Sequence, residues 1–286
     1  MGIQTRKSIN TLLRSTSYQI VKVYNSQGSV LVPPEILLDD AALEARITRG
    51  RKHAWIIAAP KSGSTWLSVI LERLLGWKKV VLTGSSNQRR EQEVDVRQMV
   101  RFPGENIFSP HQHCRASDTT VNFIKQFRVK PIIQVRDIYD SVVSFRDHCR
   151  RDGLLHSMAY LDGKFLEFSE EKQFHCIIDL VLPWYFNFYA GWFQVKGFAR
   201  EELLFVDYDD LRMDTKQSLV KILDFLEEVR TEAEIERAMG HAGGCETLKN
   251  KAVSGRGREL LNDRHKERIR QLRQYYPHID FSMVGL

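Results

Sequence analysis

Short apolar runs alternate with amphipathic stretches along most of the chain. The runs over residues 54–59, 131–135 and 203–210 have the length and composition of buried strands. The stretches that follow them have helical spacing and cover residues 67–75, 139–146 and 215–228. Alternation of this kind is typical of a central, mostly parallel sheet flanked by helices, so we expect a single α/β domain.

The rest of the pattern is less regular. A second short strand is expected at residues 79–82, an apolar-rich helical region at 174–192 and a solvated helix at 262–275. Residues 83–110 are polar and contain Gly and Pro, which predicts loops and a partial helix, a candidate substrate loop. Weak periodicity over residues 1–50 indicates an N-terminal arm ahead of the main domain, residues 51–286.

Composition narrows the class of protein. The chain has 286 residues and 43% hydrophobic content, which suits one globular domain. No apolar run approaches the ~20 residues of a membrane helix, and no secretory signal is recognised. The four cysteines, Cys114, Cys149, Cys176 and Cys245, are scattered without metal-site spacing. We therefore expect reduced thiols, a cytoplasmic location and no membrane span.

Positive charge is concentrated near the C-terminus. Residues 249–273 contain nine Lys or Arg against three Asp or Glu, and 9 − 3 equals the net charge of +6 of the whole chain. Such a segment is compatible with a nucleic acid, a membrane surface or an anionic ligand. A non-catalytic nucleic-acid-binding module is therefore one alternative function.

The most informative chemistry lies between the first strand and its helix. Residues 60–66 read P-K-S-G-S-T-W. A helix N-terminus binds anions through unpaired N–H groups and its partial positive charge, and Gly63 lets the backbone approach a ligand closely. The groups offered to a phosphate-like ligand belong to Lys61, Ser62, Gly63, Ser64 and Thr65, followed by Trp66.

The order of these residues distinguishes between phosphate loops. A Walker loop has its lysine after the second glycine, whereas Lys61 precedes Gly63. This order argues against a P-loop small-molecule kinase, which stays as a second alternative. The string instead resembles the 5′-phosphosulfate loop of sulfotransferases that use 3′-phosphoadenosine 5′-phosphosulfate (PAPS), whose pattern is P-K-[ST]-G-[ST]-T-W.

A second motif strengthens the resemblance. Arg136 follows an apolar strand and Ser144 stands eight residues later. The sulfotransferase family has an arginine and a serine at this spacing, both on the 3′-phosphate. Arginine suits the role because its fork of donors matches phosphate oxygens, although a surface ion pair with Asp137 or Asp140 is the ordinary alternative.

Two looser matches follow in the same order. Residues 203–210 resemble the family's Y-E-D-L segment, which implies that Tyr208 and Trp66 pack near the adenine; plain core packing is the commoner fate of such aromatics. The family's R-K-G loop on the 3′-phosphate is matched in part, without its G-D-W-K continuation. The residues that stand there are Arg256, Gly257 and Arg258.

The resemblance also implies catalytic residues. Lys61 would stabilise charge on the leaving phosphate oxygen. The family has a catalytic histidine about 22 residues before the 3′-phosphate arginine; His113 lies 23 residues before Arg136 and His111 lies 25 before it. We expect His113 to be the base, with His111 as the alternative, because histidine titrates near working pH.

Taken together, the resemblance implies a P-loop-NTPase-like sulfotransferase fold and a PAPS-dependent sulfotransferase. Its acceptor would be a hydroxyl or amine of a small molecule or carbohydrate, and its product 3′,5′-ADP. No metal and no nucleic acid are expected. The dimer motif common in cytosolic members is absent from the sequence, so the interpretation leaves either a monomer or a different homodimer.

Overall fold

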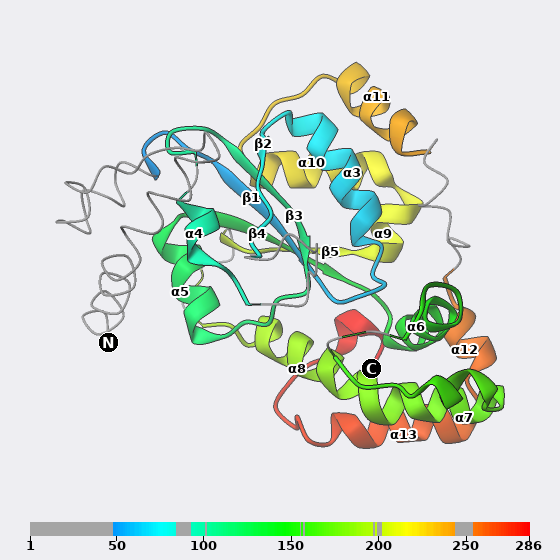
Figure 1. Cartoon of the computed structure of the whole chain (residues 1–286). Helices are drawn as coiled ribbons and strands as arrows, with labels where there is room; N and C mark the ends of the chain where they lie inside the picture. The colour runs from blue at the N-terminus through cyan, green and yellow to red at the C-terminus, as the bar shows by residue number, and fades with distance from the viewer. Residues whose placement is uncertain are drawn as a thin grey trace.

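The computed structural model describes residues 48–83, 93–100, 102–154, 156, 158–196, 198, 202–243 and 254–286 (Figure 1). The predicted N-terminal arm lies outside the described residues except for residues 48–50. The strands are β1 (His53–Ala58), β2 (Lys78–Lys79), β3 (Ile107–Gln112), β4 (Val129–Val135) and β5 (Leu204–Asp207). The α-helices are α3 (Ser64–Leu75), α4 (Val96–Met99), α5 (Asp118–Gln126), α6 (Ile138–Asp152), α7 (Glu170–Cys176), α8 (Leu182–Phe193), α9 (Tyr208–Met213), α10 (Thr215–Phe225), α11 (Glu232–Gly243), α12 (Arg256–Leu260) and α13 (Asp263–Arg273). Shorter turns are η2 (Gly163–Glu167), the π-helical η3 (Ile177–Val181) and η6 (Ser282–Val284).

The strands form one parallel sheet in the order β2-β3-β1-β4-β5. His53 of the central strand β1 lies opposite Ile107 on β3 and Val129 on β4. The prediction of a parallel sheet in a single α/β domain is confirmed. Because the strands are parallel, all their carboxyl ends lie along one edge, where loops of this architecture place ligands.

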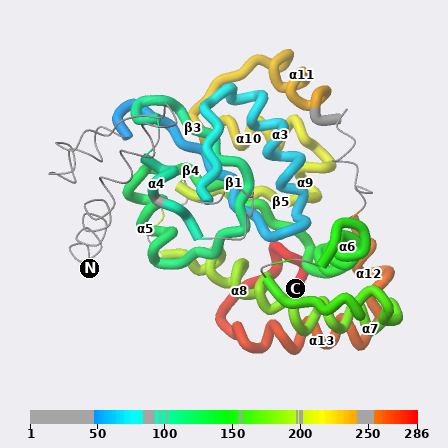
Figure 2. Tube along the Cα trace, viewed as in Figure 1, coloured from blue at the N-terminus to red at the C-terminus, as the bar shows by residue number. Residues whose placement is uncertain are grey.

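Side chains of the central strand alternate between two hydrophobic clusters. Trp55 and Ile57 belong to the cluster that includes α5, α6 and α8, whereas Ala54 and Ile56 belong to the cluster with α3, α10 and α11. These helices lie on opposite faces of the sheet in Figures 1 and 2. A strand covered on both faces needs apolar residues throughout, which explains the unbroken run in the sequence.

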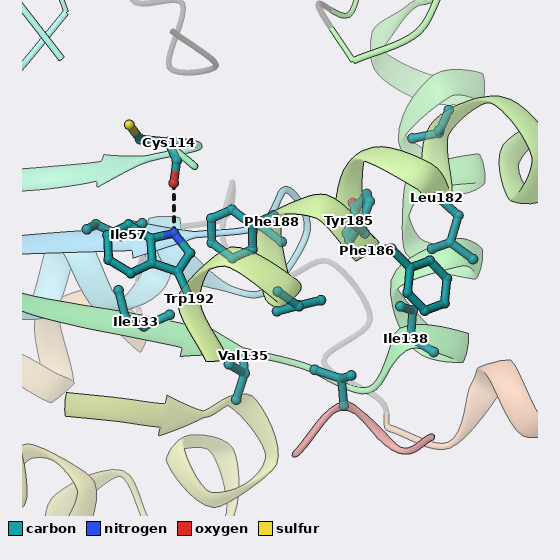
Figure 3. Close-up of a cluster of buried hydrophobic side chains, with 14 of the residues drawn as sticks. Ile57, Cys114, Ile133, Val135, Ile138, Leu182, Tyr185, Phe186, Phe188 and Trp192 are labelled. Atoms are coloured by element: carbon teal, nitrogen blue, oxygen red, sulfur yellow. Dashed lines mark hydrogen bonds between the residues drawn. The ribbon is translucent and has the colours of Figure 1, made fainter. Parts of the chain in front are cut away.

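The predicted helical region over residues 174–192 is confirmed, with a local irregularity. It comprises α7, the π turn η3 and α8, which has a proline near its start. Pro183 has no backbone N–H to continue the α-helical ladder, and a π turn before it absorbs the mismatch. The buried aromatic residues of α8 are shown in Figure 3, where the Trp192 indole N–H donates to the carbonyl of Cys114 at 2.9 Å.

Strand β3 corrects the sequence interpretation. Residues 83–110 were expected to be loops and a partial helix; α4 agrees with the partial helix, but residues 107–112 form a buried strand between β1 and β2. Pro110 obscured it, because proline cannot donate to a sheet ladder. The structure accommodates Pro110 and His111 where the register with β1 shifts, after Ser109 and before Gln112.

The last strand is shorter than predicted. β5 ends at Asp207 rather than at residue 210, and Tyr208 begins α9. The Asp207 carboxylate accepts the backbone N–H groups of Asp209 and Asp210 at 2.7 and 3.2 Å, which caps the helix. Likewise, β2 covers Lys78–Lys79 instead of residues 79–82, and α10 ends at Phe225 instead of residue 228.

Candidate active site

Four of the predicted site residues follow the carboxyl ends of four strands. Lys61 lies after β1, His113 after β3, Arg136 after β4 and Tyr208 after β5. The parallel sheet therefore brings them to one edge from well-separated parts of the sequence. The site is assembled around the loop that joins β1 to α3.

This loop has a strained and compact backbone. Lys61 and Gly63 have φ of 64° and 82°, and the Ser62 hydroxyl donates to the Ala59 carbonyl at 2.7 Å. A Cβ at residue 63 would lie 2.5 Å from the Tyr208 ring. Glycine is therefore required at this position both by the positive φ and by the lack of space for a side chain. Within the described residues, no side chain caps the N-terminus of α3. The N–H groups of Trp66 and Leu67 donate to the Gly63 carbonyl at 3.0 and 3.4 Å, and those before them in the first turn are the donors that a helix start offers to an anion.

The Lys61 amine is partly buried and lies among several charged side chains. Burial lowers the pKa of its amine from the usual 10.5, and the cations of Arg151 and Arg136 lower the pKa further, while Asp152 raises it. Lys61 also acts on His148: burial lowers the pKa of this histidine, and the positive charge of Lys61 lowers it further. The end of α6 is therefore close to the Lys61 amine.

Arg136 connects the loop to the sheet. Its Nη1 donates to the Lys61 carbonyl at 2.7 Å, and its guanidinium lies 4.4 Å from the centre of the Tyr208 ring. Its Nη2 is 3.8 Å from Asp140, which is only 2% exposed, so this contact is not the surface ion pair considered as the alternative. Tyr208 packs between Gly63 and Arg136 and supports both; Trp66, on α3, is partly buried.

The predicted C-terminal residues lie against α6. Gly255 begins α12 with φ of 87°, and the Arg256 guanidinium donates to Asp147 at 2.7 Å. Gly257 is buried, whereas the Arg258 side chain is 69% exposed and 3.8 Å from Asp137. Ser144, partly buried on α6, completes the set predicted for the 3′-phosphate. The structure thus places Arg136 just before α6, Ser144 on α6, and the start of α12 against the same helix.

The two candidate bases differ in their surroundings. The Nδ1 atom of His113 is 2.7 Å from the Ala58 carbonyl, which can only accept, so Nδ1 carries the proton and Nε2 the lone pair in the neutral ring. His111 is 8% exposed and its Nδ1 is 3.1 Å from the Ser68 hydroxyl on α3. His113 therefore lies beside the end of β1, and His111 packs against the helix.

Sequence reasoning missed several groups at this edge. The Tyr185 hydroxyl donates to the Pro60 carbonyl at 2.7 Å and supports the loop from α8, yet in the sequence Tyr185 is one aromatic among many. His148 and Asp152 form a pair at 2.5 Å near Lys61, at a helical spacing of four residues that offered a signal. Asp140 was considered only as an ion-pair partner.

Other features limit the chemistry of the described part of the chain. Within it, no group of three or more His, Cys, Asp or Glu side chains is placed to hold a metal ion. Likewise, none of the helices described is both long and apolar enough to cross a bilayer. Burial raises the pKa of the Cys114 thiol to about 12, so this cysteine beside His113 is a poor nucleophile. Cys245 lies outside the described residues.

Comparison with known proteins agrees with this arrangement. The model of the family described as "Sulfotransferase domain" matches residues 51–284. Sulfotransferase 6B1 of Danio rerio is 23% identical over 82% of this chain and 76% of its own. The amine sulfotransferase of Oryctolagus cuniculus is 22% identical over 66% of this chain and 60% of its own.

Solved structures share the fold. Mouse sulfotransferase SULT7A1 complexed with PAP superimposes with a TM-score of 0.60 at 17% identity, covering 83% of this chain and 89% of that one. Retinol dehydratase in complex with androsterone and PAP gives 0.54 at 16%, covering 84% and 85%. The chain belongs to the sulfotransferase family, an enzyme family whose reaction is sulfuryl transfer. The prediction from the sequence motifs is confirmed at this level.

Proposed function

We propose that this enzyme transfers a sulfuryl group from PAPS to a hydroxyl, or an amine, of a small-molecule or carbohydrate acceptor and releases 3′,5′-ADP. The observation that carries the proposal is the direct contact between the two predicted anion sites. Arg136 donates to the Lys61 carbonyl at 2.7 Å, and the start of α12 lies on the same helix, α6, that follows Arg136. One nucleotide with a phosphate at each end is the ligand class that needs both sites.

The residues of the chain fit such a nucleotide. The uncapped start of α3 and the amine of Lys61 offer donors and positive charge to the 5′-phosphosulfate, with Ser62, Gly63, Ser64 and Thr65 in the loop. The 3′-phosphate would be held by Arg136, Ser144 and the segment Arg256, Gly257 and Arg258. The aromatic rings of Trp66 and Tyr208 would border the adenosine.

In this mechanism PAPS supplies an activated sulfuryl group, and the protein positions it and handles charge. The acceptor oxygen forms a bond to sulfur while the bond from sulfur to the phosphate oxygen breaks. Lys61 stabilises the negative charge left on that oxygen. His113 takes the acceptor proton at Nε2, because its Nδ1 is held as a donor by the Ala58 carbonyl.

The acceptor of the proposed reaction is a hydroxyl or an amine. A hydroxyl acceptor loses its proton to the base as the bond to sulfur forms, and an amine acceptor, attacking in its uncharged form, also loses a proton. One relative at 22% identity is named an amine sulfotransferase, which supports keeping amines among the acceptors. We also propose a cytoplasmic location, supported by the buried thiols of Cys114 and Cys149. Light scattering in solution distinguishes a monomer from a homodimer.

The alternatives are not favoured by any observation of the described residues. Within the basic segment, Arg256 pairs with Asp147 and Arg268 pairs with Asp179, so part of its charge is used inside the fold. The order of Lys61 and Gly63 still argues against a kinase.

Ligand-induced thermal shift tests the proposal. The protein is heated alone, with 3′,5′-ADP, with ATP and Mg²⁺, and with an oligonucleotide. A ligand at 100 times its dissociation constant stabilises by about 2.7 kcal/mol, so 3′,5′-ADP should raise the melting temperature measurably. A shift with ATP and Mg²⁺ but none with 3′,5′-ADP at millimolar concentration would overturn the proposal.

A further inference from the structure

Asp140, on the first turn of α6, is a buried carboxylate bonded to a distant segment of the chain. Its Oδ2 accepts the backbone N–H of Gly255 at 2.9 Å, and its Oδ1 accepts the backbone N–H of Gly257 at 2.7 Å. The residue is 2% exposed. Both oxygens of one side chain therefore hold the backbone at the start of α12.

The approach of the two segments is as close as backbones allow. A Cβ at residue 257 would lie 2.2 Å from the carbonyl carbon of Tyr139 and 2.4 Å from the backbone nitrogen of Asp140. Gly255 has φ of 87°, a conformation that L side chains rarely adopt. The glycines on each side of Arg256 are thus the condition for Asp140 to reach both N–H groups.

A second carboxylate of α6 holds the side chain of the same segment. Asp147 accepts the Arg256 guanidinium at 2.7 Å and that of Arg146 at 2.9 Å. Asp140 and Asp147 are seven residues apart, which places them on the same side of the helix, two turns from each other. The Gly255–Arg256–Gly257 backbone and its arginine are consequently fixed to α6 at two points.

A carboxylate beside a predicted phosphate site would repel the phosphate unless its charge were compensated. Here the charge of Asp140 is compensated by two backbone donors and by Arg136 Nη2 at 3.8 Å. Because Arg136 and Ser144 flank Asp140 along the chain at intervals of four residues, the carboxylate also sets where α12 lies relative to them.

We propose that Asp140 is a positioning residue for the 3′-phosphate of the nucleotide: it docks the Gly255–Gly257 backbone on α6, so that the C-terminal basic segment faces Arg136 and Ser144. This inference rests on the proposed function and deepens it. It assigns nucleotide selectivity, at the 3′-position, to a residue that does not itself bind the phosphate.

Calorimetric titration of Asp140→Asn with 3′,5′-ADP and with AMP tests the inference. The two nucleotides differ only in the 3′-phosphate. An asparagine turns one acceptor into an N–H₂ donor that faces a backbone N–H, so one buried donor loses its partner. We expect the affinity for 3′,5′-ADP to fall about tenfold or more, and the affinity for AMP to stay within about twofold.

The ratio of the two affinities separates positioning from general damage. A loss of fold stability alone would weaken both nucleotides together and leave the ratio unchanged. Asp224→Asn, which removes an exposed carboxylate of α10, is the matched control and should leave both affinities unchanged. An unchanged ratio in Asp140→Asn, with wild-type preference for 3′,5′-ADP, overturns the inference while the proposed function stands.

Hydrogen exchange on the wild-type protein provides a second measurement that needs no variant. If Asp140 positions this segment for the 3′-phosphate, 3′,5′-ADP should slow amide exchange over residues 254–260 more than saturating AMP does. Equal exchange with both nucleotides overturns the inference. A wild-type protein that fails to distinguish 3′,5′-ADP from AMP in affinity would instead count against the proposed function.

Discussion

Lys61 holds its positive charge against its surroundings. Its φ of 64° places it in the left-handed region, which is uncommon for a residue with a side chain. Burial, Arg151 and Arg136 all disfavour the charged amine, and Asp152 favours it. Such strain and charge crowding at one residue are typical of a functional site. An anionic ligand would relieve the repulsion between these cations.

This electrostatic balance predicts the alkaline limb of the pH–rate profile. If activity requires protonated Lys61, activity is lost as pH rises through a pKa that lies below 10.5. Arg151→Gln removes a cation and should move the limb to higher pH, whereas Asp152→Asn removes an anion and should move it to lower pH. The measurement is kcat/KM against pH for sulfuryl transfer.

Two variants provide the comparison for this limb. Lys164→Gln, which removes an exposed lysine of η2, should leave the limb in place. Lys61→Ala should lower kcat by a factor of about 10² or more. Movement of the limb in the same direction in Arg151→Gln and Asp152→Asn would contradict the assignment of the limb to Lys61.

The proposed role of His113 as the base depends on one hydrogen bond of its ring. Its Nδ1–H donates to the Ala58 carbonyl, so Nε2 is the atom able to take a proton. We expect His113→Ala to lower kcat by a factor of about 10²–10⁴ while the dissociation constant for 3′,5′-ADP stays unchanged. Steady-state kinetics and calorimetry measure the two quantities.

A histidine of the same protein outside this edge provides the control. His175→Ala, on α7, should leave kcat unchanged, because this ring packs against His265 away from β3. The assignment fails if His113→Ala keeps its kcat while His111→Ala loses it. In that case the base would be the histidine that lies against Ser68.

At the scale of elements, helix α3 begins and ends with a left-handed glycine. Gly63 at its start has φ of 82° and Gly76 at its end has φ of 64°. The two positions differ in their neighbours: a Cβ at residue 63 meets the Tyr208 ring at 2.5 Å, whereas a Cβ at residue 76 meets nothing within 4 Å. Comparing the two glycines therefore separates the cost of a positive φ, which both share, from the cost of a steric clash, which only Gly63 would meet.

Substituting each glycine with alanine tests this difference. Gly76→Ala should destabilise the protein by about 1 kcal/mol through its positive φ alone. Gly63→Ala should cost about 1–3 kcal/mol more, because the added methyl group forces the Tyr208 ring to move. Urea unfolding measures both. Equal destabilisation would mean that Tyr208 adapts freely and does not fix the loop.

The elements also show how far the sequence leads. The strand at residues 54–59 and the loop that follows could be predicted because both local signals agree, an apolar run and a glycine turn with a lysine. Strand β3 could not, since Pro110 contradicts a strand locally and only pairing with β1 and β2 explains it. The end of β5 was placed too late because the Asp207 cap is local chemistry hidden in an acidic run.

The candidate site divides in the same way. Lys61, Arg136 and the C-terminal glycine-rich segment carry recognisable spacing, so they could be proposed from the sequence. Asp140 and Tyr185 act on segments more than a hundred residues away, through contacts that no spacing records. Tertiary contacts of this kind become visible only when the segments are placed in space.

At the scale of the whole molecule, the basic C-terminal region closes the fold. Phe281 and Val284 are fully buried in the larger hydrophobic cluster, and Arg268 of α13 pairs with Asp179 of the π turn. The described part of the segment therefore packs against α8 and α6. Part of its positive charge is paired within the fold, as in Arg256 with Asp147 and Arg268 with Asp179.

The stability of the whole molecule depends on keeping a buried histidine neutral. His53, at the start of the central strand β1, is 1% exposed and its Nε2 is 2.8 Å from the Ser109 hydroxyl on β3. Burial lowers the pKa of His53 well below 6.5, and the charge of Arg51 lowers the pKa further. Protonation of this ring is consequently far easier in the unfolded chain.

This difference predicts acid destabilisation. The folded pKa is below the unfolded pKa, so the contribution of His53 to stability is complete above pH 6.5 and is lost as the pH falls below it. In urea unfolding at about pH 7.5, 6 and 5, the wild-type free energy of unfolding should fall by up to about 1.4 kcal/mol per pH unit from this group. His53→Gln should be less stable at neutral pH but should lose stability less steeply on acidification.

His278→Gln, a substitution at an exposed position, is the control and should keep the wild-type slope of unfolding free energy against pH. If His53→Gln also keeps the wild-type slope, groups other than His53 take up the protons.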